Sequence, residues 1–249
     1  MTIKKLTKKE IYAAHDIQFE NDHILYNGKW IRELLKAGNT KTGKRVYTFS
    51  LPAGTEGTCI CDCIGCYAKT GRYNCENVRE SLKRNQDIVE NDIEFFYHAI
   101  SAQLETIGSG EIRIHASGDF NTKNSAEYAG TWKRLVSENK TFLFWTYTKM
   151  RQYETLFDGM ENGNIVKSII DGSGVNYGHC DYIIETYFKL KKAGCNVYIC
   201  RCGIDKNQHC ENCKHCATSD FVLFIEHSTE YRAEKDPLYE TLKTIIENQ

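Results

Sequence analysis

The chain has 249 residues, which is enough for one large domain or two small ones. Lysine and arginine together number 32 and aspartate and glutamate 33, so the chain lacks the overall basic excess of a protein that binds nucleic acid non-specifically. It also lacks a run of roughly eighteen apolar residues, as a membrane helix requires, and an apolar signal-peptide segment near Met1. We therefore expect a cytoplasmic protein that does not enter a membrane.

Cysteine is the informative residue type, because the chain contains 12 cysteines. Structural disulfides are rare in a reducing compartment, so this number favours metal binding. Most of the cysteines fall into two groups, one between residues 59 and 75 and one between residues 195 and 216. The sequence therefore indicates two metal sites.

Residues 1–44 have an irregular pattern and are predicted to form an N-terminal extension. Thr7 and Glu10 have the spacing of a capping box, which predicts a short helix that ends near Ala14. Asn27-Gly28 predicts a turn, and the segment from Trp30 to Leu35 has the composition of an amphipathic helix.

Residues 45–249 alternate between short β-branched or aromatic runs and longer helical segments. The predicted strands are Val46 to Leu51, Ile112 to Ala116, Phe142 to Thr148, Ile165 to Asp171, Asn196 to Cys200 and Phe221 to Glu226. The predicted helices are Asn77 to about Ile107, Ala126 to Asn139, Arg151 to about Met160, Tyr182 to Ala193 and Pro237 to Ile246. This order predicts an α/β fold with parallel strands, which both a partial (β/α)6 TIM-like barrel and an open doubly wound sheet satisfy. In either fold, ligands bind at the carboxyl ends of the strands.

The first cysteine group follows the first of these strands. Cys59, Cys63 and Cys66 have the spacing C-x3-C-x2-C, and three thiolates on one loop suit an iron–sulfur cluster with one iron left open. The alternative is a zinc site that also uses Cys61, although this spacing is cramped for zinc. We favour iron–sulfur on ligand number and spacing.

Small and polar residues follow the later strands. Ser117, Gly118 and Asp119 follow the second strand, where small residues permit close approach of a ligand and a carboxylate complements an ammonium group. The alternative is an ordinary turn in which Asp119 caps the next helix. Lys149 follows the third strand, and Asp171 and Ser173 lie in a glycine-containing loop after the fourth.

His115, within the second predicted strand, is interpreted as a packed or hydrogen-bonded core histidine.

The second cysteine group is the Cys-rich loop at residues 200–216. Cys210, Cys213 and Cys216 have the tight C-x2-C-x2-C spacing of ferredoxins, and Cys202 or Cys200 would complete a set of four. Such a site would be fully ligated and would hold an iron–sulfur cluster. A structural zinc site, with four thiolates or with three thiolates and one of the histidines at 209 and 215, is the competing interpretation.

The order of these motifs resembles that of radical S-adenosylmethionine enzymes. The resemblance implies that Cys59, Cys63 and Cys66 hold a [4Fe-4S] cluster whose fourth iron binds S-adenosylmethionine for radical chemistry. It also implies that residues 117–119 contact the amino group of this cofactor. Asp171 and Ser173 would approach its adenosine moiety. Cys61 within the motif, and Gly65 where an aromatic residue is typical, depart from the usual pattern.

A second resemblance extends from about Ser50 to Cys216. The segments 58–68, 71–73, 117–120 and 147–149 are similar to the gene-product-eighty-eight family of phage and mobile-element proteins. This resemblance implies a mobile-element origin and supports the arrangement of the motifs, but it implies no particular reaction.

Together these patterns predict an iron–sulfur enzyme with an unidentified substrate and a separate electron donor. A protein of a different class is the alternative, in which zinc or iron–sulfur only stabilises the loops and the protein binds a host factor or nucleic acid. Basic residues such as Lys44 and Arg72 are interspersed with acidic ones, which is typical of a solvated surface.

Overall fold

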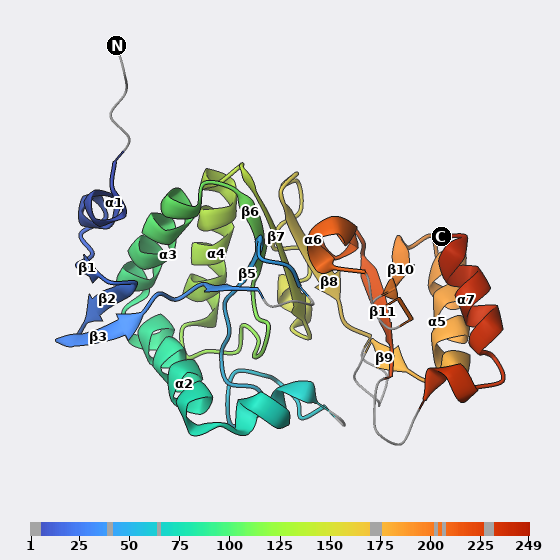
Figure 1. Ribbon diagram of the computed structural model, residues 1–249. Helices are drawn as coiled ribbons and strands as arrows, with labels where there is room; N and C mark the ends of the chain where they lie inside the picture. The colour runs from blue at the N-terminus through green and yellow to red at the C-terminus, as the bar shows by residue number, and fades with distance from the viewer. Residues whose placement is uncertain are drawn as a thin grey trace, which may run out of the picture.

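A computed structural model describes residues 6–38, 42–63, 66–169, 176–201, 204–205, 208–226 and 232–249. Helices α2 to α4 lie beside the middle strands of the chain, and α5 and α7 lie beside the last strands (Figure 1). The α-helices are α1 (Lys8–Ala14), α2 (Glu76–Asn91), α3 (Ile93–Ile107), α4 (Ser125–Glu138), α5 (Cys180–Lys192), α6 (Cys210–Cys213) and α7 (Tyr239–Glu247). The 3₁₀ helices are η1 (Tyr67–Lys69), η2 (Gly71–Asn74), η3 (Arg151–Tyr153), η5 (His215–Ala217) and η6 (Ala233–Lys235).

The strands form three sheets among the described residues. They are β1 (Phe19–Glu20), β2 (His23–Tyr26), β3 (Lys29–Arg32), β4 (Lys36–Ala37), β5 (Val46–Thr48), β6 (Gly110–Arg113), β7 (Phe142–Thr148), β8 (Gly163–Lys167), β9 (Tyr177–Gly178), β10 (Val197–Ile199) and β11 (Phe221–Ile225). The protein is therefore a mixed α/β protein, which confirms the fold class at that level.

The largest sheet has the order β4-β5-β6-β7-β8, and β5 to β8 are parallel neighbours in chain order. Ile112 pairs with Phe144, and Thr146 pairs with Ile165. Parallel strands have their carboxyl ends at one edge of a sheet. The chain segments that follow β5, β6 and β7 therefore leave the sheet at the same edge, and these segments contain the first cysteine group and residues 117–119.

The second parallel sheet has the order β10-β11-β9. The Lys167 amide at the end of β8 donates a 2.8 Å hydrogen bond to the Asp220 carbonyl just before β11, so the two parallel sheets adjoin. Although β11 is the last strand in the chain, it lies between β9 and β10, so the last strands do not follow chain order. The described strands form no closed barrel, and the partial barrel stays a prediction.

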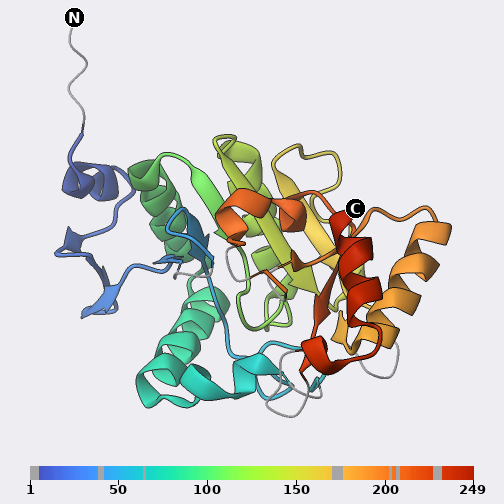
Figure 2. The same ribbon diagram turned by 45° about the vertical axis from the view of Figure 1, so that its right-hand side comes forward.

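Helices cover one face of these strands, because alternate strand residues are apolar and buried there. Ile112 and Phe144 pack with Trp132 of α4, while Ile199 and Leu223 join the core of α5 and α7. Figure 2 shows α5 and α7 side by side next to these strands. This helix-covered face supplies most of the buried apolar residues.

The opposite face, here called the inner face, is covered by the second cysteine loop instead of a long helix. Val166, Tyr198 and Val222 form a separate apolar cluster on this face, with Cys213 and Cys216 packed against it. The 3₁₀ helix η5 contacts β7, β8 and β11. Cys213 and Cys216 are therefore held against the inner face of these strands.

The N-terminal segment packs against the same core as the sheet. The predicted capping box is confirmed, since the Thr7 side chain and Glu10 bond to each other's backbone amides. Asn27 and Gly28 have φ values of 46° and 75° in the turn between β2 and β3, as a tight hairpin turn requires. The amphipathic helix predicted from Trp30 was wrong, because cross-strand pairing places residues 29–32 in β3.

Two further helix predictions were also wrong. The single helix predicted from Asn77 to Ile107 is two helices, because Asp92 has non-helical angles (φ −151°, ψ 68°) and its side chain accepts a hydrogen bond from the Phe95 amide. The segment from Arg151 to Met160 forms only η3 and turns. Each of the six predicted strand segments overlaps a strand, and β7 has the predicted bounds.

Candidate metal centre

The first cysteine loop leaves β5 at the carboxyl edge of the sheet and folds back tightly on itself. The Thr58 amide donates to the Pro52 carbonyl, and the Cys59 amide donates to the Gly54 carbonyl. A Cβ atom on Gly57 would lie 2.5 Å from the Pro52 carbonyl oxygen, so this turn requires glycine there. The resulting loop presents Cys59, Cys61, Cys63 and Cys66 as partly exposed side chains.

Residues 117–119 anchor this loop to the end of β6. Ser117 Oγ donates 2.8 Å to the Leu51 carbonyl, and the Leu51 amide donates 2.9 Å to the Ser117 carbonyl. Gly118 has a φ of 82° and fits against Thr58 and Leu51, where a side chain would collide with both. The turn predicted to bind a cofactor therefore also fixes the position of the cysteine loop.

Asp119 is 4% exposed, and its carboxylate accepts three hydrogen bonds from protein groups. Oδ1 accepts from Thr148 Oγ1 at 2.7 Å and from the Phe120 amide at 2.8 Å, and Oδ2 accepts from the Lys149 amide at 2.9 Å. Burial raises the pKa of Asp119, against the lowering effect of these hydrogen bonds. The carboxylate thus joins the ends of β6 and β7, and only Oδ2 retains an evident acceptor site for another group.

The thiols of the first group lie close enough to affect one another electrostatically. Burial raises the pKa of Cys59 to about 12, and Cys63 and Cys66 contribute to this rise. Burial and the neighbouring thiol of Cys63 raise the pKa of Cys61, while Lys149 lowers it. Lys149 therefore lies near both Cys61 and Asp119, at the predicted edge of the site.

The same loop approaches β9 across the carboxyl edge of the strands. Burial raises the pKa of Tyr177 in β9, with smaller contributions from Glu226, Cys63 and Cys66. The first cysteine group therefore lies near residues of both parallel sheets.

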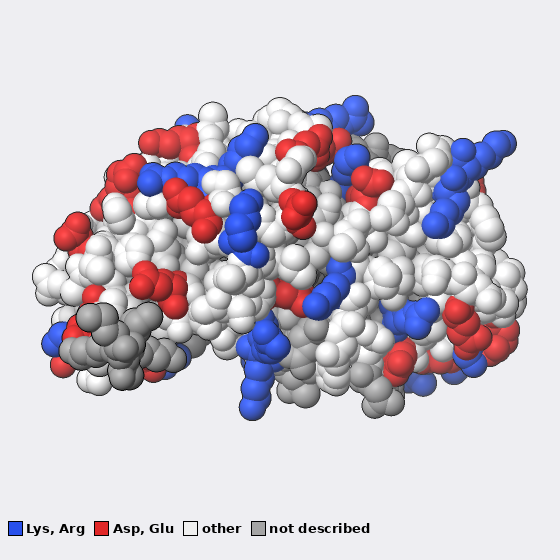
Figure 3. Space-filling view, turned by 90° about the horizontal axis from the view of Figure 1, so that it is seen from above, with Lys and Arg blue, Asp and Glu red and all other residues white. Residues whose placement is uncertain are grey.

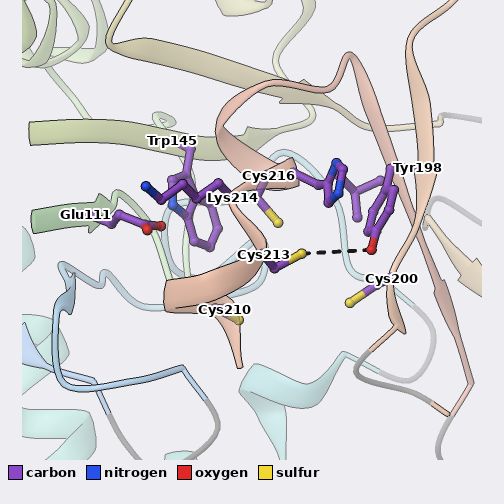
Figure 4. Close-up of a pocket in the computed structure, with 10 residues that line it drawn as sticks. Glu111, Trp145, Tyr198, Cys200, Cys210, Cys213, Lys214 and Cys216 are labelled. Atoms are coloured by element: carbon purple, nitrogen blue, oxygen red, sulfur yellow. Dashed lines mark hydrogen bonds between the residues drawn. The ribbon is translucent and has the colours of Figure 1, made fainter. Parts of the chain in front are cut away.

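The second cysteine group surrounds a small cavity between α6 and the inner face. The cavity has a volume of about 20 Å³, which is room for roughly one water molecule. Its wall includes Cys200, Cys210, Cys213 and Cys216, together with Trp145 of β7 and Tyr198 of β10 (Figure 4). Cys200 therefore shares a cavity with the three cysteines of the C-x2-C-x2-C run.

Two tyrosine hydroxyls contact the sulfurs of this group. Tyr147 Oη lies 3.0 Å from Cys216 Sγ, and Cys213 Sγ donates to Tyr198 Oη at 3.9 Å. Burial raises the pKa of Cys216 to about 12, while Tyr147 and the positive charge of Arg113 oppose the rise. Without a bound cation, burial thus keeps this thiol protonated.

Several predicted site residues are not brought together. Among the residues that the structure describes, no three or more cysteine, histidine, aspartate or glutamate side chains are gathered closely enough to hold a metal ion. Cys202, Asp171 and Ser173 lie outside the described residues.

His115 is a core histidine as predicted, because it is 3% exposed and its Nε2 lies 2.7 Å from Tyr128 Oη.

Arg113, Tyr67 and Tyr147 were not predicted as site residues. Arg113 is the last residue of β6, and its guanidinium lies on the inner face between the two cysteine groups, where it contacts Tyr67 and lies over the ring of Tyr147. A charged residue that ends an apolar strand was the available sequence signal. The contacts of Arg113 are with tyrosines that are distant in the sequence, so its position alone did not identify it as a site residue.

The surface seen from above carries acidic and basic residues side by side, without a continuous basic area (Figure 3). This view gives no support to nucleic-acid binding on that face. Within the described part of the chain, no helix has both the length and the apolar character needed to cross a membrane.

Comparison with known proteins gives one match. A protein-family model described as gene product 88 matches residues 32–170, which is more than half of the chain. No curated protein and no solved structure matches it. The matched region includes the first cysteine loop, the turn at residues 117–119 and strands β5 to β8.

Proposed function

The chain belongs to the gene product 88 family, and we propose that it is an iron–sulfur protein of the phage or mobile-element type that binds S-adenosylmethionine for radical chemistry. One observation carries the proposal. Three cysteines with cluster spacing lie on a loop at the carboxyl edge of parallel strands, and the turn after the next strand anchors this loop. Ligands of parallel α/β proteins bind at this edge.

The donor set of the first loop fits an iron–sulfur cluster. Cys59, Cys63 and Cys66 would hold three irons, and these thiols are partly exposed and mutually interacting. Such a cluster, once reduced by an electron donor, would bind S-adenosylmethionine at its fourth iron and supply the electron for cleavage of the cofactor. The partial barrel remains part of this proposal, supported by the parallel run from β5 to β8.

Residues of the chain would position both the loop and the cofactor. Thr58 Oγ1 accepts a 3.0 Å hydrogen bond from the Asp119 amide, so Cys59 is fixed relative to the end of β6. We assign Ser117, Gly118 and Asp119 to the cofactor's amino end, with Asp119 Oδ2 as the available acceptor. Asp171 and Ser173 are assigned to its adenosine end by their place after β8.

The second cysteine group would hold a second metal centre. Cys210, Cys213 and Cys216 would supply three thiolates, and Cys200 or Cys202 the fourth. Because a fully ligated centre has no open coordination site, its role would be to transfer an electron or to hold the loop on the inner face.

The test is metal content and spectroscopy of the full-length protein purified without oxygen. Iron, acid-labile sulfide and zinc are measured, and electron paramagnetic resonance of the reduced protein is recorded before and after S-adenosylmethionine is added. We expect one or two [4Fe-4S] clusters and a spectrum that the cofactor changes. Cys63→Ala should lose the cofactor-sensitive signal, whereas Cys75→Ala, which removes an exposed thiol, should keep it. An iron–sulfur signal that does not change when S-adenosylmethionine is added would contradict the proposal.

A second candidate function is a non-enzymatic protein whose cysteines hold zinc and only fold loops. Cys200, Cys210, Cys213 and Cys216 line one cavity, and four thiolates are a usual ligand set of a structural zinc ion. Zinc as the only metal in the purified protein would favour this candidate.

A further inference from the structure

Arg113 occupies an unusual electrostatic position on the inner face. Its guanidinium lies 5.4 Å from the ring centre of Trp145 and 5.7 Å from that of Tyr147. Its Nη2 donates a 3.0 Å hydrogen bond to the hydroxyl of Tyr67, which in turn donates to the Ala116 carbonyl. The side chain therefore lies in a mostly aromatic environment.

This positive charge has no carboxylate partner among the described residues, since no ion pair links Arg113 to an aspartate or glutamate. Its Nε is buried, and no hydrogen-bond partner for it is found in the described part of the chain. Burial alone lowers the pKa of Arg113, but Tyr67, Tyr147 and Cys216 raise it above its ordinary value. Arg113 is only partly exposed, and a cation withdrawn from water is normally paired, so this environment is suited to an anion.

Cys216 is a group near Arg113 that would become anionic on metal binding. Arg113 acts electrostatically on Cys216, and the ring of Tyr147 connects the two, since its hydroxyl lies 3.0 Å from Cys216 Sγ. Four thiolates around a divalent ion carry a net negative charge, and an iron–sulfur cluster with thiolate ligands is anionic as well. Cys213 and Cys216 pack against the apolar cluster of the inner face, where a nearby positive charge would stabilise such a centre.

We propose that Arg113 is the positioning residue that balances the negative charge of a metal centre formed by Cys216 and its neighbouring cysteines. This inference rests on the proposed second metal centre. It also gives β6 a specific role. The turn after β6 anchors the first cysteine loop, and Arg113 at the end of β6 supplies the positive charge next to the second cysteine group. The two cysteine groups are thereby joined through Arg113 and Tyr67, which follows Cys66 in the chain.

The test compares Zn²⁺ affinity and stability of full-length variants in a background in which Cys59, Cys61, Cys63 and Cys66 are all replaced by alanine, which removes the thiols of the first cysteine loop. Zn²⁺ affinity is measured by competition with a chromophoric chelator under reducing conditions. Arg113→Gln should weaken Zn²⁺ binding about tenfold or more, as the loss of a supporting partner does at other metal sites. Arg113→Lys, which keeps the charge, should retain most of the affinity.

The stability of the metal-free protein separates this role from simple packing. Without metal, Arg113→Gln should be as stable as the parent or more stable, because it removes a cation that has no carboxylate partner. Arg134→Gln is the matched control, since Arg134 also lies over an aromatic ring, at 3.8 Å from the centre of Tyr97, but is exposed on α4. This control should leave Zn²⁺ affinity unchanged.

The outcomes distinguish this inference from the proposed function. If the parent binds Zn²⁺ at the second group and Arg113→Gln binds it equally well, the inference is wrong and the metal centre stands. If Arg113→Gln destabilises the metal-free protein without changing the affinity, Arg113 is only a packing residue. If the parent binds neither zinc nor iron at this group, both the centre and the role of Arg113 are refuted.

Discussion

Replacing Gly118 with alanine tests whether the turn after β6 holds the first cysteine loop by close packing. Gly118 has a φ of 82°, which costs an L-residue about 1–2 kcal/mol. The added Cβ would also lie 2.6 Å from Thr58 Oγ1, 2.7 Å from Leu51 Cβ and 2.9 Å from the Leu51 carbonyl oxygen. Relieving such overlaps typically costs about 1–3 kcal/mol. We therefore expect Gly118→Ala to lower the free energy of unfolding by roughly 2–5 kcal/mol.

Two other glycines of the chain provide matched controls. Gly108 has nearly the same φ, 83°, but a Cβ there would meet nothing within 4 Å, so Gly108→Ala measures the backbone cost of about 1–2 kcal/mol alone. Gly130 lies within α4 and is also open, so Gly130→Ala should stabilise the protein by about 0.5–1 kcal/mol. The difference between Gly118→Ala and Gly108→Ala isolates the packing against the cysteine loop.

The measurement is urea unfolding of reduced, metal-free protein followed by tryptophan fluorescence, because bound metal would add its own stabilisation. Trp132 and Trp145 are buried and report on the sheet and its helices. Equal losses of stability in Gly118→Ala and Gly108→Ala would refute the packing argument. The turn would then be free to accommodate a side chain without moving the loop.

Three further predictions address other contacts. Thr58→Val removes the hydroxyl that accepts a hydrogen bond from the Asp119 amide, and it should lower the free energy of unfolding by about 1–3 kcal/mol. Thr58→Ser keeps a hydroxyl, so its free energy of unfolding in the same urea assay should be close to that of the wild type. Gln103 bonds to both the amide and the carbonyl of Leu35 at 2.8 Å, so Gln103→Leu should cost about 2–4 kcal/mol and increase proteolysis of the N-terminal segment; an unchanged protease pattern would contradict this. Burial lowers the pKa of His115 to about 3, so below pH 6.5 the unfolded state gains a proton that the native state does not bind, and stability falls by about 1.4 kcal/mol per pH unit toward pH 4. His115→Asn should not show this loss of stability, so the difference in unfolding free energy between wild type and variant should change from pH 7 to pH 4. A difference that stays constant over this range would show the reasoning to be wrong.

Predictions from local patterns succeeded where neighbours in the sequence decide the structure. The capping box at Thr7 and the turn at Asn27-Gly28 depend on residues within one turn of the chain, and both are present. The apolar run from Phe142 to Thr148 is a strand with the predicted bounds. The prediction of one helix across Asp92 failed because apolar periodicity continued through a residue that caps a new helix.

The candidate site depended on contacts between distant residues. The acid at position 119 was predicted as a cofactor ligand from its place after a strand, but its carboxylate is largely occupied by Thr148 and the Lys149 amide. Those partners are about thirty residues away, and no spacing rule connects them. The same applies to Arg113, whose environment is formed by tyrosines on two other segments.

The sequence by itself determined the α/β class, the approximate positions of six strands from β5 onward and the grouping of the cysteines on two loops. These features follow from periodicity, capping and spacing, which act over a few residues. Tertiary structure alone decided that β11 lies between β9 and β10, that the Gly118 turn is packed against Thr58, and that Cys200 shares a cavity with the second cysteine loop. The physical reason is that hydrogen-bond pairing and close packing join residues far apart in the chain, and their partners exist only once the sheet has formed.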